Sequence, residues 1–185
     1  MRQFLVFQSL WAMQTEPGPL EVQLDRIQAA GFDGITDHYW RAADVARLHA
    51  AATARGLQIE GQLFPQTVDD LAAALDVISR YGCHHLTLQA DVRPRTQVEA
   101  ARLVEGWQRL AEQVDFPVLL ETHRYRLTND LLFTLDLLAQ ISVARILIFQ
   151  LPADRHVGHA YDDCCDEHAE PHRCRELLLA LLAAC

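Results

Sequence analysis

The chain has 185 residues, half of them hydrophobic, which is enough for one globular domain with its own core. A formal net charge of −9, with no Lys- or Arg-rich run, argues against a surface for nucleic-acid phosphates. No apolar stretch approaches the length of a membrane span. Gln8 and Ser9 interrupt the apolar N-terminal segment and no small-residue cleavage site follows, so we interpret it as a strand and expect a cytoplasmic protein.

Short apolar runs alternate with Ala- and Leu-rich helical stretches over the first 150 residues. The predicted strands are Phe4–Trp11, Gly34–Asp37, Leu57–Leu63, His85–Gln89, Val118–Glu121 and Arg145–Gln150. The predicted helices are Leu20–Ala30, Ala42–Arg55, Val68–Tyr81, Gln97–Val114 and Asn129–Gln140. Gly31, Gly56 and Gly82 are suited to end the first three helices, and Thr67 is suited to begin the third.

Strands that alternate with helices predict a parallel sheet with helices outside it, either a closed barrel or an open sheet. The segment after the first strand, QSLWAMQTEPG, lacks the glycine fingerprint of a dinucleotide-binding fold. Polar groups instead follow several strands, as they do at the active end of a (β/α)8 barrel. These groups are Asp37-His38-Tyr39, Glu60-Gly61-Gln62, Gln89-Ala90-Asp91 and Glu121-Thr122-His123-Arg124. A barrel is therefore the better prediction.

The stretch PVLLETHRYR, residues 117–126, runs from three buried-strand residues directly into acid, imidazole and guanidinium groups. Together with LDRIQAAGFDGIT and LTLQADVRP, the longer segment VLLETHRYRLTNDLLFTLDLL resembles the xylose isomerase-like TIM barrels. That family contains sugar and sugar-phosphate isomerases and epimerases related to endonuclease IV. The resemblance covers residues 4 to about 142 and implies an incomplete (β/α)8 barrel of five to six βα units.

The resemblance implies that Glu121, which ends the fifth strand, is a catalytic residue and a ligand of a divalent metal (Mg, Mn or Co). Such a metal and a carboxylate together move a proton beside a carbonyl. His123 and Arg124 would then contact substrate hydroxyls or phosphate, or orient Glu121. Because one carboxylate cannot hold a divalent ion against water, we expect weak or no isomerase activity from the chain alone.

Three further side chains, His38, Glu60 and Gln89, are expected to contact the substrate, because they end their strands. The alternative for His38 is a capping or packing role, and for a Glu beside an Arg it is a solvated ion pair. His85 begins a strand and is expected to point away from the catalytic face. Trp11 lines the pocket or closes the barrel mouth. We expect five side chains to cluster at one end of the parallel sheet, because each is placed at the carboxyl end of a strand: His38, Glu60, Gln89, Glu121 and His123.

The last 35 residues, 151–185, break the family pattern, since no Asp ends the sixth strand and Cys and His accumulate instead. Three explanations stand: a zinc-binding tail, an idle extension, or a change of reading frame near residue 143, which we favour. Without a secretory signal a disulfide framework is not expected. The chain is thus predicted to consist of a partial barrel, residues 1–150, and a Cys/His-rich tail with a short C-terminal helix.

These observations predict an isomerase- or epimerase-like protein for a small sugar or sugar phosphate. The alternative is a non-catalytic barrel fragment or a zinc-binding tail protein. An unclosed sheet leaves edge strands unpaired, so we also expect the chain to self-associate.

Overall fold

The computed structural model describes residues 5–13, 18–141 and 146–149, the last of these by backbone alone. Six parallel strands form one sheet whose spatial order is their order in the chain. The strands are β1 (Phe7–Ser9), β2 (Gly34–His38), β3 (Gln58–Leu63), β4 (His85–Leu88), β5 (Val118–Glu121) and β6 (Ile146–Phe149). Parallel strands that lie side by side in chain order are the arrangement of a (β/α)8 barrel, and six of them form part of one. The predicted incomplete barrel is therefore confirmed.

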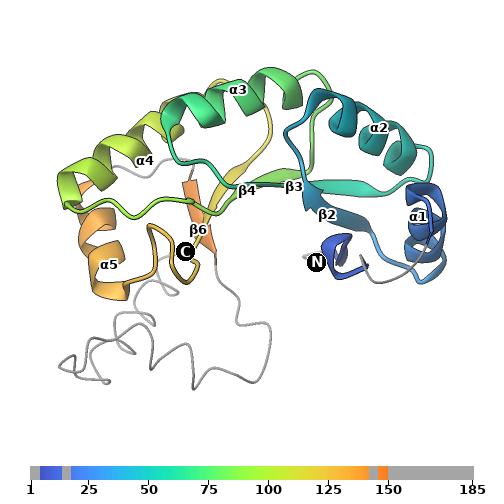
Figure 1. Cartoon of the computed structure of the whole chain (residues 1–185), viewed down its shortest axis with the longest axis horizontal. Coiled ribbons are helices and arrows are strands. Elements are labelled where there is room, and N and C mark those ends of the chain that lie inside the picture. Colours follow the sequence, from blue (N-terminus) through green and yellow to red (C-terminus); the bar gives the residue numbers. More distant parts are fainter. Residues whose placement is uncertain (1–4, 14–17, 142–145, 150–185) are drawn as a thin grey trace, which may run out of the picture.

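Five α-helices lie along the convex side of the curved sheet, as Figure 1 shows for the described part of the chain. They are α1 (Leu20–Ala29), α2 (Ala42–Thr53), α3 (Val68–Ile78), α4 (Gln97–Ala111) and α5 (Leu131–Gln140), and a short 3-10 helix, η1 (Trp11–Met13), follows β1. All six strands and all five helices were predicted; only their ends differ. None of these five α-helices lies on the other, concave face of the described sheet (Figure 1).

Local sequence explains where the helices begin and end. Thr67 accepts a hydrogen bond from the backbone of Asp70, and the Asp70 carboxylate accepts one in return from Thr67, a capping box that α4 repeats with Thr96 and Glu99. The chain leaves the third helix at Ile78, earlier than predicted, because a turn leads to Gly82 at φ 76°. A side chain at this φ is strained, so glycine is favoured there.

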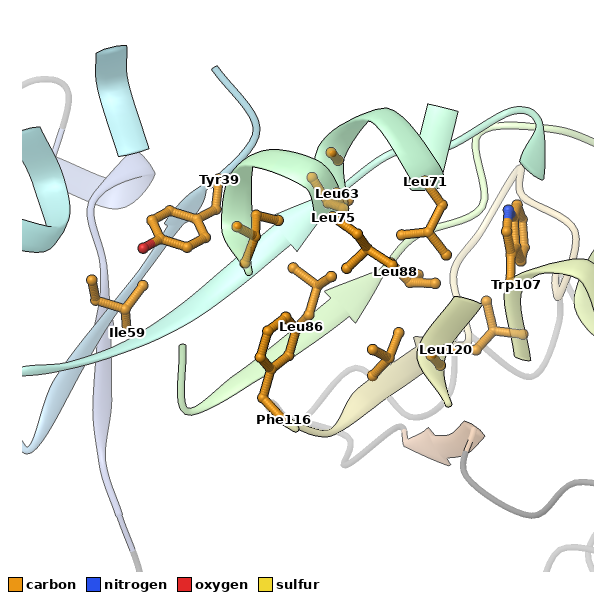
Figure 2. Close-up of a cluster of buried hydrophobic side chains, with 14 of the residues drawn as sticks. Tyr39, Ile59, Leu63, Leu71, Leu75, Leu86, Leu88, Trp107, Phe116 and Leu120 are labelled. Carbon is orange, nitrogen blue, oxygen red and sulfur yellow. The ribbon is translucent and has the colours of Figure 1, made fainter. Parts of the chain in front are cut away.

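The hydrophobic core lies between the sheet and the helices (Figure 2). Along β3 the residues Ile59, Gly61 and Leu63 are buried toward the helices, while Glu60 and Gln62 between them face the concave side. This alternation follows from the two-residue period of a strand. Trp107 of α4 is fully buried, and its indole N–H donates to the Thr67 carbonyl at 2.9 Å.

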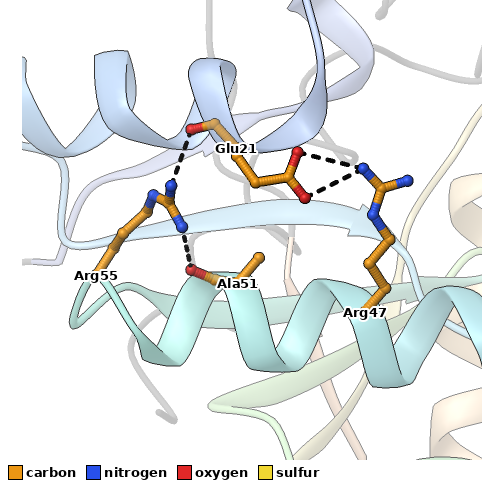
Figure 3. A network of polar contacts seen from close by, with 4 residues as sticks. All are labelled: Glu21, Arg47, Ala51 and Arg55. Atoms are coloured by element: carbon orange, nitrogen blue, oxygen red, sulfur yellow. Dashed lines mark hydrogen bonds and ion pairs between the residues drawn. The ribbon is translucent and has the colours of Figure 1, made fainter.

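A polar network joins α1 to α2 on the outer surface (Figure 3). The guanidinium of Arg55 donates to the carbonyls of Ala51 and Glu21 and to the Asp25 carboxylate, at 2.9, 3.2 and 2.7 Å. Arg47 pairs with the Glu21 carboxylate at 3.2 Å. The Arg55 side chain is only 17% exposed and that of Arg47 is 61% exposed, so Arg55 forms the stronger link.

The predicted tail, residues 151–185, lies outside the described residues, so the structure tests none of the three explanations for it. No helix in the described ranges has the length and apolar character needed to cross a membrane.

Candidate functional site

Glu121 is the last residue of β5, and its side chain lies on the concave face of the sheet. The Oε2 atom accepts a hydrogen bond from Nε2 of Gln89, the residue directly after β4, at 2.9 Å. In a parallel sheet the carboxyl ends of neighbouring strands meet at one edge, which explains why residues 32 positions apart touch. The two residues that the sequence predicted at these strand ends are therefore in direct contact.

Glu60 lies deeper on the same face. It is the third residue of the six in β3, so the prediction that it ends its strand is wrong. Its carboxylate accepts hydrogen bonds from the hydroxyl groups of Thr36 on β2, at 2.6 Å, and Thr87 on β4, at 2.9 Å. Both carboxylate oxygens are thus held by the neighbouring strands, and Glu60 is fixed within the sheet.

His85 also contacts this carboxylate, so the prediction that it points away from the catalytic face is wrong. Its Nε2 lies 3.4 Å from Oε1 of Glu60. The physical reason is register: Glu60 pairs with His85, and paired residues of adjacent strands share a face. Gln89 comes four residues after His85 and shares that face too, so a site that contains Gln89 must have His85 below it.

His38 ends β2 within a cluster of aromatic rings. Its ring stacks on Trp40 at 4.9 Å between centroids and meets the edges of Phe64 and Trp11 at 5.0 and 5.5 Å. Its Nε2 is buried without a hydrogen-bond partner among the described residues. Trp11 is 56% exposed, so it covers His38 from the outside and leaves the two roles predicted for it open.

The loop from β5 to α5 carries His123 and is held by its own side chains. The Thr128 hydroxyl donates to the Glu121 carbonyl and accepts from the His123 backbone N–H, both at 3.1 Å. Nδ1 of His123 lies 2.8 Å from the Arg124 carbonyl. A carbonyl can only accept, so Nδ1 donates in this contact and Nε2 is the ring nitrogen left for a further contact.

Arg124 is exposed at the surface of this loop, next to Tyr125, whose φ of 62° marks a tight turn. The arginine that reaches across the sheet ends is instead Arg126. It forms an ion pair with Asp91 in the loop after β4, and its guanidinium carbon lies 5.8 Å from the centroid of Phe64. Sequence reasoning missed Arg126, although the motif ETHRYR contains both arginines.

The two carboxyl groups on the concave face differ in their pKa. Burial raises the pKa of Glu121; the hydrogen bond from Gln89 and the charge of His123 oppose this, and the charge of Glu60 adds to it. Burial acts in the same direction on Glu60, but hydrogen bonds from His85, Thr36 and Thr87 outweigh it, and the pKa of Glu60 is lowered. Glu60, which loses its proton more readily than an ordinary carboxyl group, therefore lies near Glu121, which holds its proton more strongly.

The structure thus brings Glu60, Gln89, Glu121 and His123 into one electrostatically coupled group, and places His38 in the aromatic cluster beside it. Arg124 stays at the loop surface. Such a face can bind a polar molecule and exchange a proton with it. Within the described ranges, no three His, Cys, Asp or Glu side chains come together in a way that could hold a metal ion.

Solved structures with this architecture identify the class of fold. A sugar phosphate isomerase/epimerase from Parabacteroides distasonis superimposes with a TM-score of 0.62 at 10% identity, over 77% of this chain and 63% of that one. The probable 3-DHS dehydratase AsbF from Bacillus anthracis gives a TM-score of 0.57 at 18% identity, over 78% of this chain and 62% of that one.

An AP endonuclease of family 2 from Brucella melitensis gives 0.60 at 13% identity, over 86% of this chain and 77% of that one. A xylose isomerase-like TIM barrel fused to 4-hydroxyphenylpyruvate dioxygenase is similar as well, with a TM-score of 0.60. These matches confirm the resemblance to the xylose isomerase-like TIM barrels at the level of the fold. No protein-family model matches the sequence, and no curated protein is significantly similar to it.

The chain spans less than two thirds of the length of the first two of these structures. Its six strands therefore correspond to part of their barrels, which agrees with the incomplete barrel described above.

Proposed function

We propose that the described strands form the substrate-binding part of a sugar or sugar-phosphate isomerase/epimerase-like protein, in which Glu121 exchanges a proton beside a carbonyl. The observation that carries this proposal is the position of Glu121 at the end of β5, held by Gln89 and close to His123 and Glu60. The printed activity of the Parabacteroides neighbour supports the choice of substrate class. A cytoplasmic location remains a prediction.

Each neighbour of Glu121 has a part in this proposal. Gln89 orients the carboxylate through its amide N–H. His123 presents Nε2, the ring nitrogen that does not contact the Arg124 carbonyl, to a substrate hydroxyl. Burial raises the pKa of Glu121, which makes its carboxylate a stronger base for taking a proton from carbon; the carboxyl group so formed can return the proton. His38 contributes a ring face and one polar atom.

A divalent metal, which the resemblance implies, would need more ligands than the described residues offer, because they contain no group of three or more suitable side chains. Glu121 would be one ligand and the others would come from elsewhere. The proton transfer proposed here therefore rests on the carboxylate, and slow turnover is expected. The alternative, a non-catalytic fragment, predicts sugar binding without proton exchange.

The test is deuterium exchange. Ketoses and their phosphates are incubated with the chain in D2O, with and without Mn²⁺, and NMR follows loss of the C–H signal beside the carbonyl. We expect slow exchange that Glu121→Gln abolishes and that the matched surface variant Glu112→Gln leaves unchanged. Binding without exchange would favour the non-catalytic alternative, and the absence of both would overturn the proposal.

A further inference from the structure

Two side chains beside one aromatic ring, at the carboxyl ends of the strands, each carry a buried polar atom that has no hydrogen-bond partner in the described part of the chain. These atoms are Nε2 of His38 and Nε of Arg126; the third such atom of the described residues, Oε1 of Gln97, belongs to α4. The His38 ring meets Phe64 at 5.0 Å, and the Arg126 guanidinium lies 5.8 Å from the same ring. A buried donor or acceptor without a hydrogen-bond partner destabilises the fold, so two such atoms beside one ring call for an explanation.

The way Arg126 is held leaves the Nε edge of its guanidinium buried and without a hydrogen-bond partner among the described residues. Nη1 contacts Oδ1 of Asp91, whereas Nε has no acceptor within the described residues. Asp91 is fixed in turn, since its N–H donates to the Pro65 carbonyl at 3.0 Å and its Oδ2 accepts from the Gln66 amide at 3.3 Å. The arginine is therefore anchored by one nitrogen, and the Nε side is the edge that binds a planar oxyanion in a bidentate way.

We propose that Arg126 is a specificity residue that binds an oxyanion of the substrate, a carboxylate or a phosphate, beside the Phe64 ring. His38 Nε2 meets a hydroxyl or carbonyl group of the same molecule, and the rings of Trp40, Phe64 and Trp11 contact its apolar face. This inference rests on the proposed function for the sugar part of the ligand. It adds that the substrate is an acidic sugar derivative rather than a neutral sugar.

The net positive charge around Arg126 is small, which suits an oxyanion that carries little negative charge. The Asp91 carboxylate already offsets part of the Arg126 charge, and that ion pair is partly exposed, with the two side chains 25% and 40% accessible. The Arg126 guanidinium carbon also lies over the Phe64 ring, and this cation–π contact limits the movement of the side chain, which lowers the entropy lost when an oxyanion binds. If the Arg126–Asp91 ion pair served only to stabilise the fold, the buried Nε without a partner would lower that stability and have no function.

The experiment compares three six-carbon probes: D-gluconate, D-glucose 6-phosphate and D-glucose. Isothermal titration calorimetry on the full chain gives their affinities. We expect one or both acids to bind about tenfold more tightly than glucose, the gain of one charge-assisted hydrogen bond. A preference for gluconate identifies a carboxylate site, and a preference for glucose 6-phosphate identifies a phosphate site.

The variants separate recognition from stability. Arg126→Gln should bring the acids down to the affinity of glucose. Arg102→Gln, at an exposed arginine of α4, is the matched control that should not. Asp91→Asn should strengthen acid binding several-fold, because it removes the competing carboxylate; a purely structural ion pair predicts the opposite. Should Arg126→Gln fail to fold, Asp91→Asn and Arg126→Lys carry the test, since Lys keeps the charge but lacks the Nε edge.

NMR supplies a readout that a structural role would not move. The Nε–Hε signal of Arg126 should shift downfield when the acid probe is added and stay unchanged with glucose. Glucose binding as tightly as both acids, or an acid preference that survives Arg126→Gln, would overturn the inference, as would the absence of binding by all three. Glu121→Gln should leave the acid preference intact, so loss of proton exchange and loss of oxyanion binding are distinguishable.

Discussion

Glu60 and His85 occupy paired positions of β3 and β4, and the imidazole Nε2 lies 3.4 Å from the carboxylate Oε1. This contact lies on the concave face of the sheet, below the carboxyl ends of the strands. Glu60 also accepts from two threonine hydroxyls, so the group is a stabilising feature of the sheet as well as a neighbour of Glu121.

Glu60→Gln should destabilise the chain by about 1–2 kcal/mol at pH 7, because an acceptor of charge-assisted hydrogen bonds becomes neutral. The pKa of Glu60 is lowered on folding, mainly because hydrogen bonds from His85 and Thr36 outweigh burial. Its stabilisation is therefore complete above the ordinary value of 4.5 and is lost as the pH falls through the lower folded pKa. Urea unfolding at pH 7 and below pH 4.5 should show the difference between variant and wild type shrink; a constant difference would contradict this.

Glu121→Gln should have the opposite effect and stabilise the chain at pH 7 by about 0.5–1 kcal/mol, a gain typical of changes at functional sites. Burial raises the pKa of Glu121, so its protonated form favours folding below 4.5, and this advantage is lost as the pH rises through the folded pKa. Gln buries no charge. Thermal unfolding at pH 7 measures the gain, which should vanish in acid; a loss of stability at pH 7 would refute the prediction.

Arg55→Ala should cost about 1–2 kcal/mol, whereas Arg47→Ala should have little effect. Arg55 is mostly buried, and it donates to the Ala51 carbonyl of α2 and to the Glu21 carbonyl of α1 (Figure 3). It also donates to the Asp25 carboxylate of α1. The exposed Arg47 pair is screened by water. Urea unfolding of both variants checks this, and equal losses would mean that the two pairs are equivalent.

Gly34→Ala should destabilise the chain by about 1–3 kcal/mol. A Cβ at this position would lie 2.4 Å from a ring carbon of Phe7 and 2.6 Å from the Gln58 carbonyl oxygen. Backbone cannot move aside as a flexible side chain can. Gly31→Ala is the control: its φ of 83° strains a side chain, but nothing lies within 4 Å, so its cost should be about 1 kcal/mol. Differential scanning calorimetry compares the two, and a smaller loss for Gly34→Ala would contradict the packing argument.

Self-association is expected from the strand order, since β1 and β6 are the two ends of the described sheet. The side chain of Val6, next to β1, is 55% exposed. Val6→Lys should reduce association, because a charge discourages edge pairing, and Val98→Lys on the outer surface of α4 should not. Sedimentation at several concentrations decides this; a wild-type monomer at tens of micromolar would rule out edge pairing.

The sequence by itself determined the alternation of strands and helices, because hydrophobic periodicity and the residues that end helices or strands act locally along the chain. Apolar runs, glycines such as Gly82 and the cap Thr67 need no distant partner to have their effect. The sequence also placed Glu121 and Gln89 at the ends of strands, because the change from apolar to polar residues shows where a buried strand ends. The prediction that Glu60 ends its strand was wrong, since it is the third residue of β3, and its role as a site residue stays a prediction.

Only the tertiary structure decided which of these side chains meet. Register between strands, which depends on the packing of the whole sheet, paired Glu60 with His85 and turned a residue that had been excluded toward the site. The fold of the loop after β5 brought Arg126 to Asp91 and Phe64. Neither outcome is encoded in a local pattern, because each depends on contacts between residues 25 or more positions apart.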